Sequence, residues 1–229
     1  MKSMPLRVIA SGLVVLLFCG SAPAGLSDQE AKIQQVMEVI TAVSGMPESI
    51  PASLLEDTQA IAIIPAVIKV GLVIGGRYGR GVILVRRADS WSGPAFVSIT
   101  GGSVGWQIGA RSTDVILVFK SRSSVQGLVD GKFTLGADAS VAAGPVGRAA
   151  SAATDVRLDA EIYSYSRSRG LFAGVALQGA HLKMEHGDNA KYYRRAGITP
   201  QQVLSGDEPM PPSAQRLALL LARQTGGER

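Results

Sequence analysis

The residues that could perform covalent chemistry are few and poorly spaced for it. Gly101 to Gly105 reads Gly-Gly-Ser-Val-Gly and matches the Gly-x-Ser-x-Gly pattern of a nucleophilic serine. That pattern needs a helix directly after the serine, whereas residues 106–119 have the composition of strand and turn. His181 and His186 are the only histidines, and neither their spacing nor a third ligand indicates a metal site. The sequence therefore predicts no catalytic residue, no metal and no cofactor, and we expect the protein not to be an enzyme.

Arginines within the glycine-rich stretch from Val70 to Arg87 are the most distinctive polar feature. Four glycines between Gly75 and Gly81 are too many for a helix interior, so strands joined by a tight turn are predicted. Arg77 and Arg80 are expected at that turn, where a guanidinium could bind a phosphate through two hydrogen bonds. They are the first candidates for contact with an anionic partner. Further candidates follow at the expected strand ends: Lys69, Arg86, Arg87, Lys120 and Arg122.

Charge is distributed unevenly along the chain. Residues 66–123 contain eight bases and two acids, whereas residues 28–65 contain six acids and one base. A basic block of this kind attracts an anionic surface. The alternative is that Arg77 or Arg80 pairs with an acid of the first segment and holds that segment on the sheet, the candidates being Glu38, Glu56 and Asp57. Nucleic acid is not the expected partner, because aromatic residues are only 5% of the chain and such surfaces usually interleave them with the bases.

The first residues have the composition of an export signal. Lys2 and Arg7 flank the start, an apolar core runs from Val8 to Phe18, and Ala22-Pro23-Ala24 gives a small-x-small cleavage pattern. Residues 1–24 are therefore predicted to be a signal peptide, which makes the protein periplasmic or secreted and peripherally associated with a membrane. Cys19, the only cysteine, offers a lipoprotein alternative. Bulky Phe18 disfavours it, because a small residue usually precedes a lipidated cysteine.

Beyond that segment the pattern is that of an α+β domain. An amphipathic helix is predicted from Ser27 to Ser44, with Ser27 and Glu30 as a capping box. Apolar runs separated by short turns then predict a glycine-rich, largely antiparallel β core. Its expected strands are residues 60–64, 67–74, 82–85, 95–100, 104–108, 115–120, 133–142, 160–166 and 171–184, with short helices at 51–57 and 121–129. Similar stretches at Gly93–Gly102 and Gly170–Gly179 suggest that the core has two similar halves.

Helices are expected again at the C-terminal end, packed on the same core. Thr199 and Gln202 form a predicted capping box, and Gly206 ends that helix. A last helix begins at Ser213, after the proline-rich residues 209–212. The chain is thus divided into a signal peptide at 1–24, a main domain at 25–206, and a proline-rich linker with a C-terminal helix at 207–229.

Six glycine-rich motifs between residues 33 and 193 resemble the SYLF-domain family. They are Gly75–Val82, Trp91–Phe96, Gly105–Ala110, Leu135–Ser140, Ala143–Arg148 and Tyr165–Val175. The resemblance implies a lipid-binding domain over residues 25–206, because eukaryotic members bind phosphoinositides. A yeast actin-patch member also binds actin filaments. Those members carry an added SH3 or zinc-finger module, whereas this chain is similar to single-domain bacterial members that begin with a signal peptide.

Two departures from the family pattern concern the expected mode of binding. Members often have glycine after the tyrosine pair where this chain has Tyr192-Tyr193-Arg194, and the N-terminal helix that inserts into membranes in some members has an acidic polar face here. We expect non-catalytic binding of anionic phospholipid, with phosphoinositide-like head groups, at a membrane surface. The alternatives are an actin- or other protein-binding module, or a structural protein of the cell envelope whose arginines are only solvated.

Overall fold

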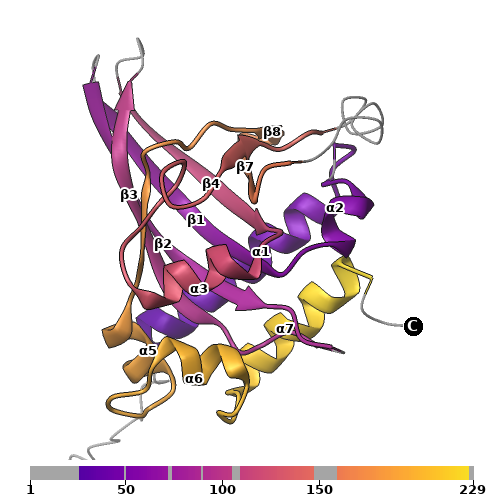
Figure 1. Cartoon of the computed structure of the whole chain (residues 1–229), viewed down its shortest axis with the longest axis vertical. Helices are drawn as coiled ribbons and strands as arrows, with labels where there is room; N and C mark the ends of the chain where they lie inside the picture. The colour runs from indigo at the N-terminus through magenta and orange to yellow at the C-terminus, as the bar shows by residue number, and fades with distance from the viewer. Residues whose placement is uncertain are drawn as a thin grey trace, which may run out of the picture.

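One curled β-sheet with helices on both faces forms the described part of the protein (Figure 1). The computed structural model describes residues 26–48, 50–71, 74–88, 90–104, 109–146 and 159–226. Within them the sheet has nine strands in the order β5-β9-β3-β2-β1-β4-β7-β6, with β8 paired to β7. Neighbouring strands are antiparallel except for β6 and β7, which are parallel. The predicted α+β fold with a largely antiparallel β core is confirmed.

The elements follow the chain in the order of their numbers. The helices are α1 (Asp28–Ser44), α2 (Ala52–Glu56), α3 (Arg122–Asp130), α5 (His186–Tyr192), α6 (Pro200–Ser205) and α7 (Pro212–Gln224). The strands are β1 (Ala60–Gly71), β2 (Ile74–Val85), β3 (Ala95–Val104), β4 (Gly109–Phe119), β5 (Phe133–Thr134), β6 (Val141–Ala143), β7 (Ile162–Ser168), β8 (Leu171–Gly174) and β9 (His181–Met184). The signal-peptide prediction for residues 1–24, including Cys19, lies outside the described residues. In the described part of the chain, no helix combines the length and apolar character needed to cross a membrane.

Helix α1 forms where the sequence predicts it. The Ser27 side chain accepts a hydrogen bond from the Glu30 backbone N–H at 3.2 Å, which satisfies one of the free donors at the helix start. Gly45 follows the last turn. A stripe with helical spacing is buried against the sheet: Ile33, Val36, Val39, Ile40 and Val43. The helix therefore uses its apolar face to cover the sheet.

Both faces of the sheet carry a hydrophobic core. Side chains of β1 alternate between them, so that Ile61 and Ile63 pack with α1 and α7 while Ala62 and Ile64 lie in the core that includes α3 and α6. We call these the α1 face and the α3 face. Residues 115–119 of β4 are all buried and alternate in the same way. An unbroken apolar run of this kind is typical of a strand that is covered on both faces.

A β-bulge at Pro65 and Ala66 divides β1 into two parts. The register with β4 shifts between Ile64 and Val67, and Ala66 adopts a left-handed φ of 53°. Its backbone N–H donates to Asp114 Oδ1 at 3.0 Å. Gly81 of β2 lies against the bulge, where a Cβ atom would overlap the Ile63 carbonyl and approach Ile64 Cα to 2.6 Å. The glycines from 75 to 81 thus belong to a strand that accommodates the bulge, and the prediction that they form a tight turn is wrong.

Other expected elements differ in extent. Residues 133–142 form β5, a tight turn and the start of β6 in place of one strand, because Gly136 takes a left-handed φ of 87°. Residues 171–184 form two strands, β8 and β9, which lie at different places in the sheet. The similar stretches are not structurally equivalent either. Gly93–Gly102 contributes to a central strand, whereas Gly170–Gly179 contributes the short β8 and a turn, so the sheet is continuous and is not built from two similar halves.

The C-terminal helices join the same cores. Thr199 and Gln202 form the predicted reciprocal capping box at the start of α6, and Gly206 ends it with a left-handed φ of 77°. Leu217 and Leu221 of α7 are buried in the core on the α1 face. The Tyr192 hydroxyl lies 2.7 Å from Ser213 Oγ, which joins α5 to α7, and burial raises the pKa of Tyr192 to about 12. Helix α7 is therefore an integral part of the α1 face.

Candidate functional site

Four strands continue past the bulge as a projecting arm. We define the arm as residues 67–71 of β1, 74–79 of β2, 100–104 of β3 and 109–113 of β4. Figure 1 shows these strand ends extending beyond the helices at the upper left of the molecule. Large apolar side chains are exposed on the arm, whereas most apolar side chains of the same strands are buried on the other side of the bulge. The arm is thus the part of the sheet that is available to a partner.

Three basic residues form one row across the arm. Lys69 of β1 pairs with Arg77 of β2 on one side and with Arg111 of β4 on the other. Directly paired residues of antiparallel strands point to the same face, and Val67, two residues before Lys69, is buried in the core of the α3 face. The basic row, Arg77-Lys69-Arg111, therefore lies on the α3 face of the arm. Three adjacent positive charges on neighbouring strands favour an anionic partner.

Arg77 has the most unusual environment in the basic row. Its Nε atom is buried and has no hydrogen-bond partner among the described residues. Burial lowers the pKa of the Arg77 guanidinium, because desolvation disfavours the charged form. Across β2 it faces Gly101 of β3, where no side chain competes for the space. A buried donor without a partner is costly, and an anionic group bound at the row would satisfy it.

The opposite face of the arm is apolar. Ile68, Val70 and Tyr78 expose 50%, 55% and 51% of their surface. Ile68 pairs with Tyr78 across β1 and β2, and Val70 follows Ile68 by two positions, so the three share the α1 face. The arm is therefore amphipathic, with charge on one side and exposed apolar surface on the other. Such a surface on a protein usually marks a contact with another molecule.

Arg80 lies on the other face of β2 and binds within the protein. It forms an ion pair with Asp188 of α5, whose second carboxylate oxygen accepts a hydrogen bond from Gln29 Nε2 of α1 at 2.9 Å. The hydrogen bond to Asp188 raises the pKa of Arg80. Asp188 is the partner, and none of the three acids expected from sequence, Glu38, Glu56 and Asp57, takes that place. Arg80 nevertheless holds α1 on the sheet, through the shared carboxylate.

The remaining predicted residues lie at the far end of the strands and contact the protein itself. Arg86 donates to the Leu55 carbonyl at 2.9 Å, and its guanidinium lies 5.1 Å from the centre of the Trp91 ring. Arg87 donates to the Ser205 carbonyl. Lys120 lies 3.9 Å from Asp57, and Arg122 Nε donates to Gln59 Oε1 at 2.9 Å. Of the seven predicted site residues, the structure brings only Lys69 and Arg77 together as neighbours on the arm.

The residues considered for catalysis lie in strands β3 and β9 and at the start of α5. Ser103 lies in β3, and the next described element is strand β4, whereas a nucleophilic serine of this pattern occupies a strand-to-helix turn. His181 Nδ1 lies 2.9 Å from Thr134 Oγ1 at the β9–β5 pairing. Across the ranges that the structure describes, no three His, Cys, Asp or Glu side chains gather as a metal site would require.

Sequence reasoning missed Arg111 and the apolar face of the arm. Arg111 is separated from Lys69 by 42 positions, and only the strand register places them side by side. The signal that could have found the amphipathic arm is the alternation of apolar and basic residues in Ile68, Lys69 and Val70. That alternation is typical of a half-buried strand, but the bulge before it was not predictable from composition.

The structure is an α+β domain with a projecting, amphipathic arm. Residues 100–224 match the model of the Ysc84 family, described as Las17-binding protein actin regulator. The chain belongs to this Ysc84, or SYLF-domain, family. It is 34% identical over 206 residues to the protein YSC84 of Saccharomyces cerevisiae, which covers 87% of this chain and 44% of the yeast protein.

Two further relatives are similar to most of the chain and, like the yeast protein, are longer than the stretch that matches. An SH3 domain-containing protein of Schizosaccharomyces pombe is 39% identical over 181 residues, covering 77% of this chain and 42% of that protein. The human SH3 domain-containing YSC84-like protein 1 is 34% identical over 193 residues, covering 83% of this chain and 56% of the human protein. The chain thus spans about half the length of the relatives it matches.

Proposed function

We propose that the chain is a non-catalytic binding module whose partner is a protein of the actin-regulating machinery. The observation that carries the proposal is the family match over residues 100–224, whose description names Las17 binding and actin regulation. A second yeast relative is itself named LAS seventeen-binding protein 3. The chain supplies a projecting surface for such a contact in the arm. Acidic protein surfaces are complementary to the basic row of Arg77, Lys69 and Arg111.

Co-sedimentation with actin filaments and capture on immobilised Las17 test this proposal with the whole chain. We expect binding in at least one assay, and a loss of that binding when Lys69, Arg77 and Arg111 are all replaced by Glu. The matched control reverses three exposed lysines elsewhere, Lys132, Lys183 and Lys191, and therefore changes the net charge equally. Absence of binding in both assays would reject a partner of this class. Equal losses in the two triple variants would reject the arm as the contact surface.

The apolar face of the arm favours a second candidate, binding to an anionic phospholipid surface. Each basic residue close to such a surface contributes roughly 1 kcal/mol of attraction, and the exposed Ile68, Val70 and Tyr78 could enter the interfacial layer. Lys69 and Arg77 are the predicted lipid contacts that the arm retains. The other predicted lipid contacts are weaker candidates because their side chains contact the protein itself: Arg80, Arg86, Arg87, Lys120 and Arg122.

Vesicle flotation separates the two candidates. Vesicles of phosphatidylcholine with phosphatidylserine or a phosphoinositide should carry the protein upward at low salt and release it as salt screens the charges. Replacing Ile68 and Val70 by Ser should reduce flotation and leave filament or Las17 binding intact. Flotation that is unchanged in this double variant and in the charge-reversed triple variant would reject lipid binding through the arm.

We also propose that residues 1–24 direct export and that cleavage follows Ala24. Support comes from the Ala22-Pro23-Ala24 pattern after an apolar core. The intact mass of the exported protein distinguishes the two processing routes. A mass beginning at Gly25 is expected, and a mass with an acylated Cys19 would establish the lipoprotein route instead.

A further inference from the structure

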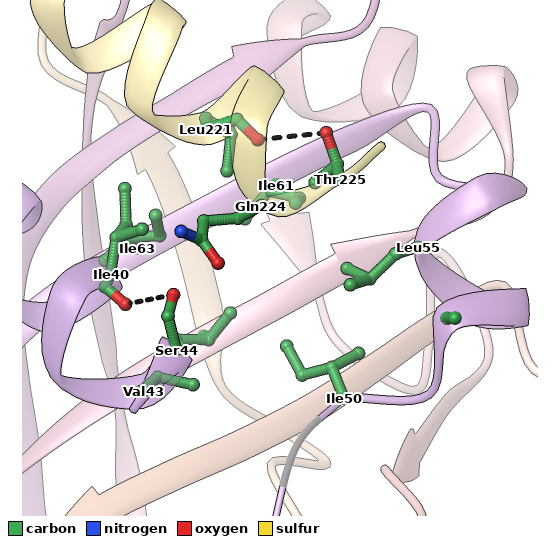
Figure 2. A pocket seen from close by; sticks show the side chains of 12 residues that line it. Ile40, Val43, Ser44, Ile50, Leu55, Ile61, Ile63, Leu221, Gln224 and Thr225 are labelled. Carbon is green, nitrogen blue, oxygen red and sulfur yellow. Dashed lines mark hydrogen bonds between the residues drawn. The ribbon is translucent and has the colours of Figure 1, made fainter. Parts of the chain in front are cut away.

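A cavity lies between α1, α2, α7 and the sheet, at the opposite side of the bulge from the arm. Its volume is about 310 Å³. Apolar side chains form most of its wall: Ile40, Val43, Ile50, Leu55, Ile61, Ile63, Ile116 and Leu221. Figure 2 labels all of them except Ile116 and shows the labelled side chains around a common space, from α1, the α2 segment, the sheet and the end of α7. Protein interiors are packed closely enough that voids much larger than a water molecule are few, so a space of this size is a candidate ligand site.

One end of the cavity is closed by a hydrogen-bonded network. Arg86 donates to the Leu55 carbonyl at 2.9 Å and to the Thr225 carbonyl at 3.4 Å, which joins α2 to the end of α7. Trp91, only 3% exposed, donates from Nε1 to Thr225 Oγ1 at 3.2 Å. Leu55 and Thr225 both line the cavity. This end of the site is therefore built and fixed, and it does not depend on a ligand to form.

Two polar residues of the cavity, Ser44 and Gln224, are exposed at its mouth, and the third, Thr225, is buried at the closed end. Ser44 Oγ donates to the Ile40 carbonyl at 2.8 Å, and Thr225 Oγ1 donates to the Leu221 carbonyl at 3.0 Å, so both hydroxyl protons are used within the protein (Figure 2). The exposed Gln224 amide projects between α7 and α1 in the same view. An amide both donates and accepts hydrogen bonds. Gln224 is therefore the group at the mouth that can recognise the polar end of a ligand.

Opposite charges lie close together at the mouth. Ser44 ends α1 and Gln224 ends α7, so the C-terminal ends of both helices meet there. A helix C-terminus carries partial negative charge, whereas the last turn of α7 contains the basic residue Arg223. Because these charges offset each other, a ligand head that matches the neutral Gln224 amide is itself uncharged.

We propose that this cavity binds a linear aliphatic molecule of medium chain length with an uncharged, hydrogen-bonding head, such as an alcohol. A methylene group occupies about the volume of a water molecule in the liquid, ~30 Å³, so the cavity accommodates roughly ten of them. The chain fills the apolar wall, and the head meets the Gln224 amide. This site uses no residue of the arm and is independent of the proposed function.

Titration of the whole protein with decan-1-ol tests the site. Saturable shifts are expected in the methyl resonances of Ile40, Ile61 and Ile116, which line the cavity. Ile99, buried in the core on the α3 face, serves as the internal reference and should not shift. Decanoate, with the same chain and an anionic head, should bind more weakly, because an ionised carboxylate loses more hydration on entering an apolar site than a hydroxyl does. Shifts that do not saturate, or that spread equally to Ile99, would overturn the proposal.

Two exposed positions allow the mouth to be blocked without overpacking a core. Ala52→Phe places a ring at the cavity lining from the start of α2, and Ala137→Phe makes the same change in an exposed turn after β5. We expect decan-1-ol binding to be lost in Ala52→Phe and retained in Ala137→Phe. Gln224→Leu should keep the aliphatic chain bound but remove the preference for the alcohol over decane. Retained binding in Ala52→Phe with an unchanged melting temperature would overturn the proposed site.

Discussion

Replacing Arg80 should destabilise the protein, whereas replacing Arg77, three residues earlier on the same strand, should not. Arg80 forms an ion pair with Asp188, and the same carboxylate accepts a hydrogen bond from Gln29 of α1. The Asp188 side chain is only 11% exposed, so it is left largely buried when the arginine is removed. In the part of the chain that the structure describes, Arg77 forms no ion pair that its replacement would break.

The size of the effect follows from the exposure of the two groups. A hydrogen bond to a charged group contributes about 1.5–3 kcal/mol. The Arg80 side chain is 40% exposed, and solvent screening reduces its part of that contribution. We therefore expect Arg80→Ala to lower the free energy of unfolding by about 2 kcal/mol. For a domain of this size that corresponds to a melting temperature lower by about 4–8 °C.

Thermal and denaturant unfolding of Arg80→Ala, Asp188→Ala and the double variant measure the coupling directly. The interaction free energy from this cycle should be about 1–2 kcal/mol, because the two residues share one contact. Arg77→Ala is the matched control and should change the melting temperature by less than about 2 °C. A coupling near zero, or equal losses of stability for Arg77→Ala and Arg80→Ala, would refute the assignment of Arg80 as the residue that holds α1 and α5 on the sheet.

Three further changes test the physical account of the fold. Gly81→Ala should cost about 3 kcal/mol or more, because its Cβ would overlap the β1 backbone at the bulge, whereas Gly76→Ala has open space and should be nearly neutral in chemical denaturation. Arg194→Gly should raise the free energy of unfolding by about 0.5–1 kcal/mol, since Arg194 adopts a left-handed φ of 52°. Glu161→Gln should lower the melting temperature at neutral pH. The Glu161 carboxylate accepts hydrogen bonds from the Ser140 N–H and the Ser124 hydroxyl, both at 3.0 Å. These hydrogen bonds lower the pKa of Glu161 from its usual 4.5. A carboxylate whose pKa is lower in the folded state contributes stability that is complete above the unfolded-state pKa and is lost as pH falls through the folded-state pKa. The difference in melting temperature between Glu161→Gln and the unchanged protein should therefore vanish in acid. A difference that persists in acid would contradict this cause.

The left-handed conformation of Arg194 also accounts for a departure visible in the sequence. Family members often have glycine after the tyrosine pair, and glycine adopts positive φ without steric cost. Arg194 keeps that conformation at the end of α5, where the Tyr193 hydroxyl donates to the Pro94 carbonyl at 3.0 Å and fixes the preceding residue. The departure therefore places a residue with a Cβ atom at a position where the backbone conformation favours glycine.

The sequence alone determines those helices and strands that depend on residues close to one another along the chain. Ser27 and the apolar stripe of α1, and the Thr199–Gln202 capping box of α6, are set by neighbours three or four residues away. The unbroken apolar run at 115–119 likewise indicated a strand covered on both faces. Family-specific motifs then indicated a binding domain before any pairing of strands was known.

The register between distant strands determines which face each basic residue occupies and which residues become its neighbours. The sequence shows Arg77 and Arg80 as equivalent residues among glycines, but the alternation of β2 turns them to opposite faces, one toward the basic row and the other toward Asp188, 108 positions away. Arg111 joins Lys69 only because β4 pairs with β1. The glycines between 75 and 81 are compatible with a turn and with a close approach of two backbones, because glycine permits both. The strand pairing places Gly81 directly against the β1 backbone at the Pro65–Ala66 bulge, beyond which the strands continue as the arm.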